Sequence, residues 1–179
     1  MAQSIIIGLV GVAGSGKTIV ARHLVERHGF ERIRFAGPLK DMIKAGLGLS
    51  DEYLDGDKKN EPIPWAGNCT ARHLMQTLGT EWGRRMVHSD IWVNRWRELA
   101  RDGEGRRIIA DDVRFPNEAA AVKSLNGGLW RVVRPGLVTM DHPSERAQRS
   151  IQEDFLINNA TTIGEMIKSV DAVVAGIGG

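Results

Sequence analysis

The chain has 179 residues, of which 42% are hydrophobic and 26% are charged, and its formal net charge is +2. This composition excludes a wholly disordered chain, and the small net charge argues against a protein that coats nucleic acid. No run approaches the roughly 20 apolar residues that a membrane-spanning helix needs, and the single cysteine, Cys69, excludes an internal disulfide framework. We therefore expect one globular domain in a reducing cytoplasm, with neither a membrane nor a stable nucleic-acid partner.

The first part of the chain alternates between strand and helix patterns. Residues 5–10 form a nearly continuous apolar run, which is typical of a central strand covered on both faces. A helix over about 17–28 follows, ended by Gly29, then a short strand near 33–35 and a helix whose first turn holds Pro38. The residues expected on the inward faces of these two helices are Val20, Ala21, Leu24, Val25, Leu39, Met42, Ile43 and Leu47.

Residues 48–68 are rich in charged residues and turn formers, which predicts a mobile connection. After this segment, the alternation of helices and strands continues to the end of the chain. The expected elements are a helix capped by Thr70, a helix over 90–101, strands over 107–111, 129–134 and 155–158, a helix opened by Pro116, and a last helix behind a Thr162–Glu165 capping box. Such alternation predicts an α/β fold with a mainly parallel five-stranded sheet flanked by helices on both faces. Ligands of such folds bind beyond the carboxyl ends of the strands.

The most specific motif lies between the first strand and the first helix. The segment GVAGSGKT, residues 11–18, matches the pattern G-x-x-x-x-G-K-[ST] in the strand-to-helix context that the pattern requires. The residues whose backbone would surround the phosphates of ATP are Gly11, Ala13, Gly14, Ser15 and Gly16, together with Lys17 and Thr18. Lys17 would reach the β- and γ-phosphates, and the Thr18 hydroxyl would hold Mg²⁺.

A second candidate site follows the strand over 107–111, where Asp111 and Asp112 are adjacent and Arg114 comes soon after. Carboxylates at such a strand end can hold Mg²⁺ through its water shell. Successive side chains at a strand end point in opposite directions, so we expect one carboxylate to face the metal and the other to bond nearby backbone. Asp112 is the favoured metal residue, and Asp111 is the alternative.

Seven blocks of the chain, taken in order, resemble the deoxynucleoside monophosphate kinases of bacteriophages. They are FAGPLK (35–40), RHLMQTLGTEWGR (72–84), DIW (90–92), DDVRFPNEA (111–119), WRVVRPG (130–136), HPSE (142–145) and DFLIN (154–158). The resemblance implies transfer of the γ-phosphoryl group of ATP to a (deoxy)nucleoside 5′-monophosphate, in the host cytoplasm if the chain is phage-encoded. It leaves a homodimer open. Small GTPases have a similar length, but the chain lacks their Asn-Lys-x-Asp base-reading segment.

The resemblance also places the acceptor in a mobile region at about 36–100 of a single kinase domain. Lys40, Arg72 and Arg84 are the cations in the matching blocks there, and Trp82 is a candidate for stacking on a base, against the alternative of core packing. A phosphomonoester is already an anion, so its attacking oxygen needs no general base. Arg114 could touch either the acceptor phosphate or the transferring group.

A short closing lid is expected at about 134–150. Arg134, Arg146 and Arg149 would fold over ATP there and exclude water. The residues expected to act in catalysis are Lys17, Asp112, Arg114 and Arg134. His142 and Glu145 match the family block without a physical role that we can name.

Three other functions compete with this interpretation. The first is a kinase for another small phosphorylated metabolite, phosphomevalonate or dephospho-coenzyme A, where Asp112 could act as the base toward a hydroxyl acceptor. The second is a nucleic-acid-associated NTPase, which the near-neutral charge disfavours. The third is an inactive scaffold, which the intact Lys17, Thr18, Asp112 and Arg114 disfavour.

Overall fold

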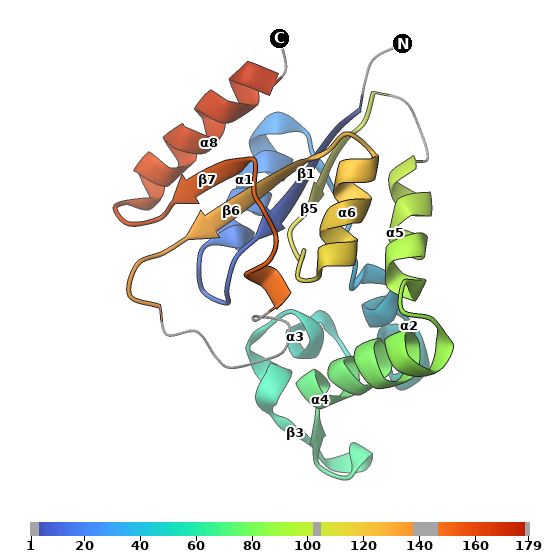
Figure 1. The fold of residues 1–179 in the computed structure, drawn as a ribbon. Helices are drawn as coiled ribbons and strands as arrows, with labels where there is room; N and C mark the ends of the chain where they lie inside the picture. The colour runs from blue at the N-terminus through green and yellow to red at the C-terminus, as the bar shows by residue number, and fades with distance from the viewer. Residues whose placement is uncertain (1–3, 102–104, 138–146, 178–179) are drawn as a thin grey trace. The chain divides into compact units, whose positions relative to one another are not determined.

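The computed structural model describes residues 4–101, 105–137 and 147–177. The chain divides into two compact units (Figure 1): residues 1–34 together with 97–179 form the first, and residues 35–96 form the second. The second unit covers nearly the same residues as the region expected to bind the acceptor. Within the described residues, no helix is long and apolar enough to cross a bilayer.

The first unit is built on a parallel sheet with β1 (Ile5–Val10) at its centre. The strand order is β2-β5-β1-β6-β7, and every neighbouring pair is parallel. The other strands are β2 (Glu31–Arg32), β5 (Arg107–Ala110), β6 (Gly128–Val133) and β7 (Phe155–Asn158). The predicted five-stranded parallel sheet is therefore confirmed, although β2 lies two residues before the expected 33–35.

Helices cover both faces of this sheet. Side chains alternate along β1, so successive residues of the strand contact different helices. Ile7 and Leu9 join the core formed with α1 (Lys17–His28) and α8 (Ile163–Ile177). On the other face, a methyl group added at Gly8 would meet Val122 of α6 (Pro116–Ser124) at 3.1 Å. Figure 1 shows α1 and α8 on one side of the sheet and α6 on the other.

The helix ends follow the sequence signals. Gly29, with φ 65°, ends α1 in the left-handed conformation that glycine favours. At the start of α8, the Glu165 amide donates to Thr162 Oγ1 at 3.2 Å, and the Thr162 amide donates to Glu165 Oε2 at 3.3 Å. This reciprocal pair is the predicted capping box. The sequence predicts Val25 on the inward face of α1, but Val25 is exposed in the structure.

The second unit has a separate apolar core. Its elements are α2 (Gly37–Leu47), α3 (Asp51–Leu54), η1 (Asp57–Asn60), β3 (Pro62–Ile63), η2 (Pro64–Ala66), β4 (Cys69–Thr70), α4 (Ala71–Gln76), η3 (Thr77–Val87) and the start of α5 (Ile91–Arg101). Within 48–68, where the sequence predicts a mobile connection, short helices and strands form, and Leu49, Leu54 and Ile63 are buried. Met42 and Leu47 are exposed rather than buried, since α2 buries Leu39 and Ile43.

The helix expected after Thr70 begins as α4 and continues as a π-helix, η3. Thr70 caps α4 as predicted, accepting the His73 amide at 3.1 Å, but from Thr77 the backbone widens. Trp92 explains the local packing: its Nε1 donates to Gly79 O at 2.8 Å, and a methyl group at Gly83 would lie 2.7 Å from the same nitrogen. A tertiary contact of this kind has no local signature. Long π-helices are rare, and π turns are frequent at functional sites.

Candidate functional site

The phosphate loop joins the carboxyl end of β1 to the start of α1. Gly11, Gly14 and Gly16 have φ values of 149°, 79° and 113°, which residues with a β-carbon rarely adopt. A methyl group at Gly11 would lie 2.5 Å from Val132 O, so close approach to β6 also requires glycine there. The motif therefore folds into the tight loop that its glycines predict.

Lys17 and Ser15 carry the polar groups of this loop. Lys17 Nζ donates to Gly11 O at 2.5 Å and to Val12 O at 2.9 Å, so the ammonium group lies back over its own loop. Ser15 Oγ is buried and has no hydrogen-bond partner among the described residues. Ala13, Gly14 and Thr18 are exposed. A cation and an unsatisfied buried hydroxyl in one glycine-rich loop fit a bound phosphate group.

Two distant residues that sequence reasoning missed hold the loop in place. The buried Gln148 accepts the Gly11 amide through Oε1 at 3.1 Å. Asn159 donates through Nδ2 to Ser15 O at 2.9 Å. Asn159 follows β7, so a search for polar residues after predicted strands could have found it, whereas Gln148 has no such signal.

The adjacent carboxylates after β5 have different environments. Asp111 is buried, and Arg32 of β2 donates to it in a two-pronged arrangement, with Nε 3.0 Å from Oδ1 and a second short contact to Oδ2. The sequence predicts that the carboxylate facing away from the metal bonds nearby backbone. Asp111, which is the less favoured metal residue, instead binds the Arg32 side chain. Asp112 is half-buried. The assignment of Asp112 to the metal stays a prediction.

Glu118 braces the turn that carries Arg114, and sequence reasoning missed it. Its carboxylate is buried and accepts the backbone amides of Arg114 at 2.7 Å and Phe115 at 3.1 Å. The Arg114 side chain is exposed. An acidic residue in the first turn of a helix, here two residues after Pro116, is a recognisable capping signal.

The segment after β6 approaches the phosphate loop. A methyl group at Gly14 would meet the Leu137 side chain at 3.6 Å, and Arg134, three residues earlier, is exposed. Arg149 is also exposed, whereas His142, Glu145 and Arg146 lie outside the described residues. The expected lid over 134–150 therefore stays a prediction.

Arg131 links β6 to residues 148–153, which come later in the chain. It donates to Gln148 O at 3.1 Å, to Ile151 O at 2.5 Å and to Glu153 Oε2 at 2.7 Å. The hydrogen bond from Arg131 lowers the pKa of Glu153 below its usual range. Because Gln148 holds Gly11, Arg131 also supports the phosphate loop.

The second unit carries the residues proposed for the acceptor. Lys40 pairs with Asp55 at 2.5 Å, Arg72 Nε donates to Asn60 Oδ1 at 2.7 Å, and Arg84 donates to Ser89 O at 3.2 Å. Arg72 is exposed, whereas Lys40 and Arg84 are half-buried.

Trp82 and Arg85 lie on the same π-helix as Arg84. Trp82 is 37% exposed, and its ring centroid lies 6.3 Å from that of Trp92. Its side chain is therefore partly packed and partly open to solvent. Arg85 pairs with Glu81 on the same helix.

A family model described as deoxynucleotide monophosphate kinase matches residues 57–170. The chain belongs to this family. The match includes Arg72, Arg84 and the 111–119 block, and it confirms the resemblance read from the sequence. The protein is accordingly a phosphotransferase of the nucleoside monophosphate kinase class.

Two relatives extend the family match over most of the chain. A protein of Acanthamoeba polyphaga mimivirus, assigned as a deoxynucleotide monophosphate kinase, is 37% identical over 186 residues, covering 95% of this chain and 96% of the relative. The deoxynucleoside-5′-monophosphate kinase of Escherichia phage T5 is 24% identical over 213 residues, covering 80% and 84%.

Solved structures confirm the kinase fold. A Thermus thermophilus protein aligns with a TM-score of 0.55 at 18% identity, covering 99% of this kinase and 100% of that chain. The APS kinase of Mycobacterium tuberculosis aligns with a TM-score of 0.54 at 11% identity, covering 100% of both chains. At these identities the likeness concerns the fold alone.

Proposed function

We propose that this kinase transfers the γ-phosphoryl group of ATP to a (deoxy)nucleoside 5′-monophosphate, which yields the diphosphate and ADP. The phosphate loop, with its positive-φ glycines and Lys17 at the start of α1, is the observation that carries the donor half. The acceptor half rests on membership of the deoxynucleotide monophosphate kinase family.

On the donor side, the loop amides and the positive end of α1 bind the phosphates. Lys17 exchanges the carbonyls of Gly11 and Val12 for the β- and γ-phosphate oxygens, and the Ser15 hydroxyl gains an acceptor. Arg134, Arg149 and the segment ending at Leu137, which follow β6 in the chain, would close over the nucleotide and exclude water; the approach of Leu137 to Gly14 supports this role.

The oxygen donors at the carboxyl edge of the sheet fit Mg²⁺ rather than a softer ion. Thr18 would hold the ion through its hydroxyl, and Asp112 through its water shell. When bound, Mg²⁺ neutralises charge that develops on the transferring group. Asp111 is engaged by Arg32, so its part is to fix the strand end from which Asp112 projects.

On the acceptor side, the phosphomonoester brings its own anionic nucleophile, so binding and charge balance are the main tasks. Arg72 and Arg84 bind its phosphate, with Lys40 contributing positive charge beside Asp55. Trp82, 37% exposed, offers a ring face to the base. Arg114, whose backbone amide is held by Glu118, balances charge on the acceptor phosphate or the transferring group.

An ADP-release assay across the common deoxy- and ribonucleoside monophosphates tests this function, with the Lys17→Ala variant as the blank. We expect turnover of at least one deoxynucleoside monophosphate that depends on ATP and Mg²⁺. Phosphomevalonate and dephospho-coenzyme A belong in the same panel. Turnover of either of these, without turnover of any nucleoside monophosphate, would overturn the proposal.

A further inference from the structure

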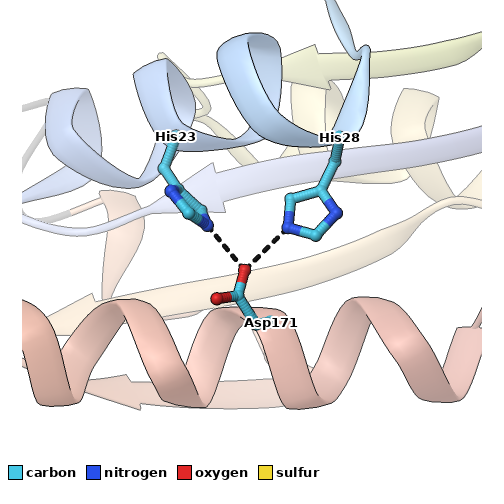
Figure 2. Close-up of side chains that lie close together, drawn as sticks. All are labelled: His23, His28 and Asp171. Carbon is cyan, nitrogen blue, oxygen red and sulfur yellow. Dashed lines mark hydrogen bonds and ion pairs between the residues drawn. The ribbon is translucent and has the colours of Figure 1, made fainter.

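Three potential metal ligands meet between α1 and α8, away from the phosphate loop. His23 and His28 lie on α1 and Asp171 lies on α8, and Figure 2 shows both imidazole rings pointing toward the same carboxylate. Asp171 Oδ1 is 2.6 Å from His23 Nε2 and 2.7 Å from His28 Nε2. One ligand atom from each of the three residues lies within 4.8 Å of the others.

The surroundings suit a small cation. The two histidine side chains are only 17% and 22% exposed, whereas the Asp171 side chain is 46% exposed. An ion can therefore arrive from the carboxylate side and be shielded by the rings. The rings meet edge to face, with centroids 5.3 Å apart, which lets both Nε2 atoms approach one point.

We propose that His23, His28 and Asp171 bind one divalent transition-metal ion, and that Zn²⁺ is the best match. Two imidazole nitrogens and one carboxylate oxygen form a set that zinc accepts readily, whereas Mg²⁺ prefers oxygen ligands alone. Three protein ligands leave a fourth tetrahedral position for water. This site is separate from the Mg²⁺ site proposed at Thr18 and Asp112.

Zinc binding would require the three ligand atoms to move apart. With metal–ligand bonds of about 2.0–2.1 Å, tetrahedral ligand atoms lie about 3.3 Å apart. The present separations of 2.6 and 2.7 Å would therefore each widen by about 0.6 Å. In the present arrangement each Nε2 donates to the Asp171 carboxylate, so zinc would replace both hydrogen bonds, and each ring would carry its proton on Nδ1 and offer the Nε2 lone pair to the ion.

The bound ion would act as a structural link. It would join segments separated by 148 and 143 positions in the chain. Both segments lead to the phosphate loop, since α1 begins at Lys17 and α8 follows Asn159, which holds Ser15. From Lys17 the helix rises about 9 Å to His23 and about 16 Å to His28, so the ion would not contact the transferring phosphates directly.

Zinc titration of the untagged, chelator-treated protein tests the site. By calorimetry we expect one Zn²⁺ per chain, and we expect Tm to rise until that ratio is reached. His23→Gln, His28→Gln and Asp171→Asn should each weaken zinc binding by at least about tenfold and remove most of the Tm rise. The matched control is His73→Gln, because His73 is an exposed histidine of α4, and it should change neither result.

Two further measurements keep the test decisive if a variant unfolds. Asp171→Glu retains a carboxylate and should retain zinc binding, and Co²⁺ bound to the wild-type protein should give a visible absorption band that Asp171→Asn lacks. Turnover with saturating Mg²⁺ should not change when zinc is chelated. Absence of zinc binding to the wild-type protein, or equal binding by the three variants and the wild type, would overturn the proposal. So would an equal loss in His73→Gln.

Discussion

At the residue scale, adjacent side chains of the same type have different tasks because their surroundings differ. Asp111 is buried against Arg32 while Asp112 is half-buried, and Arg84 and Arg85 differ in what they contact. Chemical type predicts what a residue can do, while its contacts decide whether it is available to do it.

Lys17→Ala should reduce kcat by roughly 10³-fold or more, since a cation at the transferring phosphates is lost. Two hydrogen bonds of the Lys17 ammonium go to its own loop, and we expect the free energy of unfolding without ligand to change by about 1 kcal/mol or less. Steady-state kinetics and thermal melting measure the two effects. A variant with a tenth of wild-type kcat would contradict the assignment of the loop.

Asp112→Asn should weaken the Mg²⁺ dependence and lower kcat more than it raises the KM of the acceptor, because an amide does not balance the metal's charge. Asp111→Asn should instead destabilise the fold by about 1.5–3 kcal/mol, since it removes a charged partner of Arg32. Kinetics against Mg²⁺ concentration, together with denaturant unfolding, separate the two. If Asp111→Asn proved to have the stronger Mg²⁺ effect, the assignment would be reversed.

At the element scale, the π-helix η3 and the 148–153 segment show how contacts across elements determine local backbone. Trp92 packs on Gly79 and Gly83 and accompanies the widened turns of η3. Arg131 of β6 holds the chain that supplies Gln148 to the phosphate loop.

Gly83→Ala should destabilise the protein by about 1–3 kcal/mol, because the added methyl group would lie 2.7 Å from Trp92 Nε1. Gly46→Ala in α2 is the matched control, since nothing lies within 4 Å of its added methyl group, and it should stabilise the helix by about 0.5–1 kcal/mol. Thermal melting of both variants measures the contrast. Equal effects in the two would show that Trp92 does not pack against Gly83 as described.

The Arg131–Glu153 pair should make stability depend on pH. Because the folded pKa of Glu153 is lowered, the pair's contribution is complete above the unfolded pKa of about 4.5 and is lost as pH falls through the folded pKa. Glu153→Gln should therefore cost about 1 kcal/mol at pH 7 and progressively less in acid. Urea unfolding at several pH values measures the difference, which would be constant with pH if the pair contributed nothing.

At the scale of the whole molecule, the two compact units suggest a division of labour. The first unit carries the phosphate loop and the carboxylates, and the second carries Arg72 and Arg84. Variants in different units should therefore affect different substrates.

Arg72→Ala or Arg84→Ala should raise the KM of the deoxynucleoside monophosphate roughly ten- to a hundredfold and leave ATP affinity nearly unchanged, since a charged hydrogen bond to phosphate is lost. Arg→Lys at either position should recover part of the loss. Arg134→Ala should instead impair ATP use and kcat.

Arg85→Ala is the control for these variants, because that side chain is exposed and pairs with Glu81. It should leave both KM values unchanged. Initial-rate kinetics with each substrate varied in turn measure all of these variants. Equal damage to both substrates at Arg72 and Arg84 would mean that these arginines support the fold instead.

Features that depend on short-range chemistry could be predicted from the amino-acid sequence. They are the glycines that tolerate the positive φ values of the 11–16 loop, the helix caps at Thr70 and Thr162, and the apolar runs of the strands. In each case the residues that determine the feature lie within a few positions of one another. Ordered blocks along the chain also identified the kinase family. Tertiary structure alone decided which distant side chains meet: Arg32 with Asp111, Gln148 and Asn159 with the phosphate loop, and His23 and His28 with Asp171. These contacts span 79 to 148 positions, and they exist because parallel strands bring their carboxyl ends to one edge and neighbouring helices to one face.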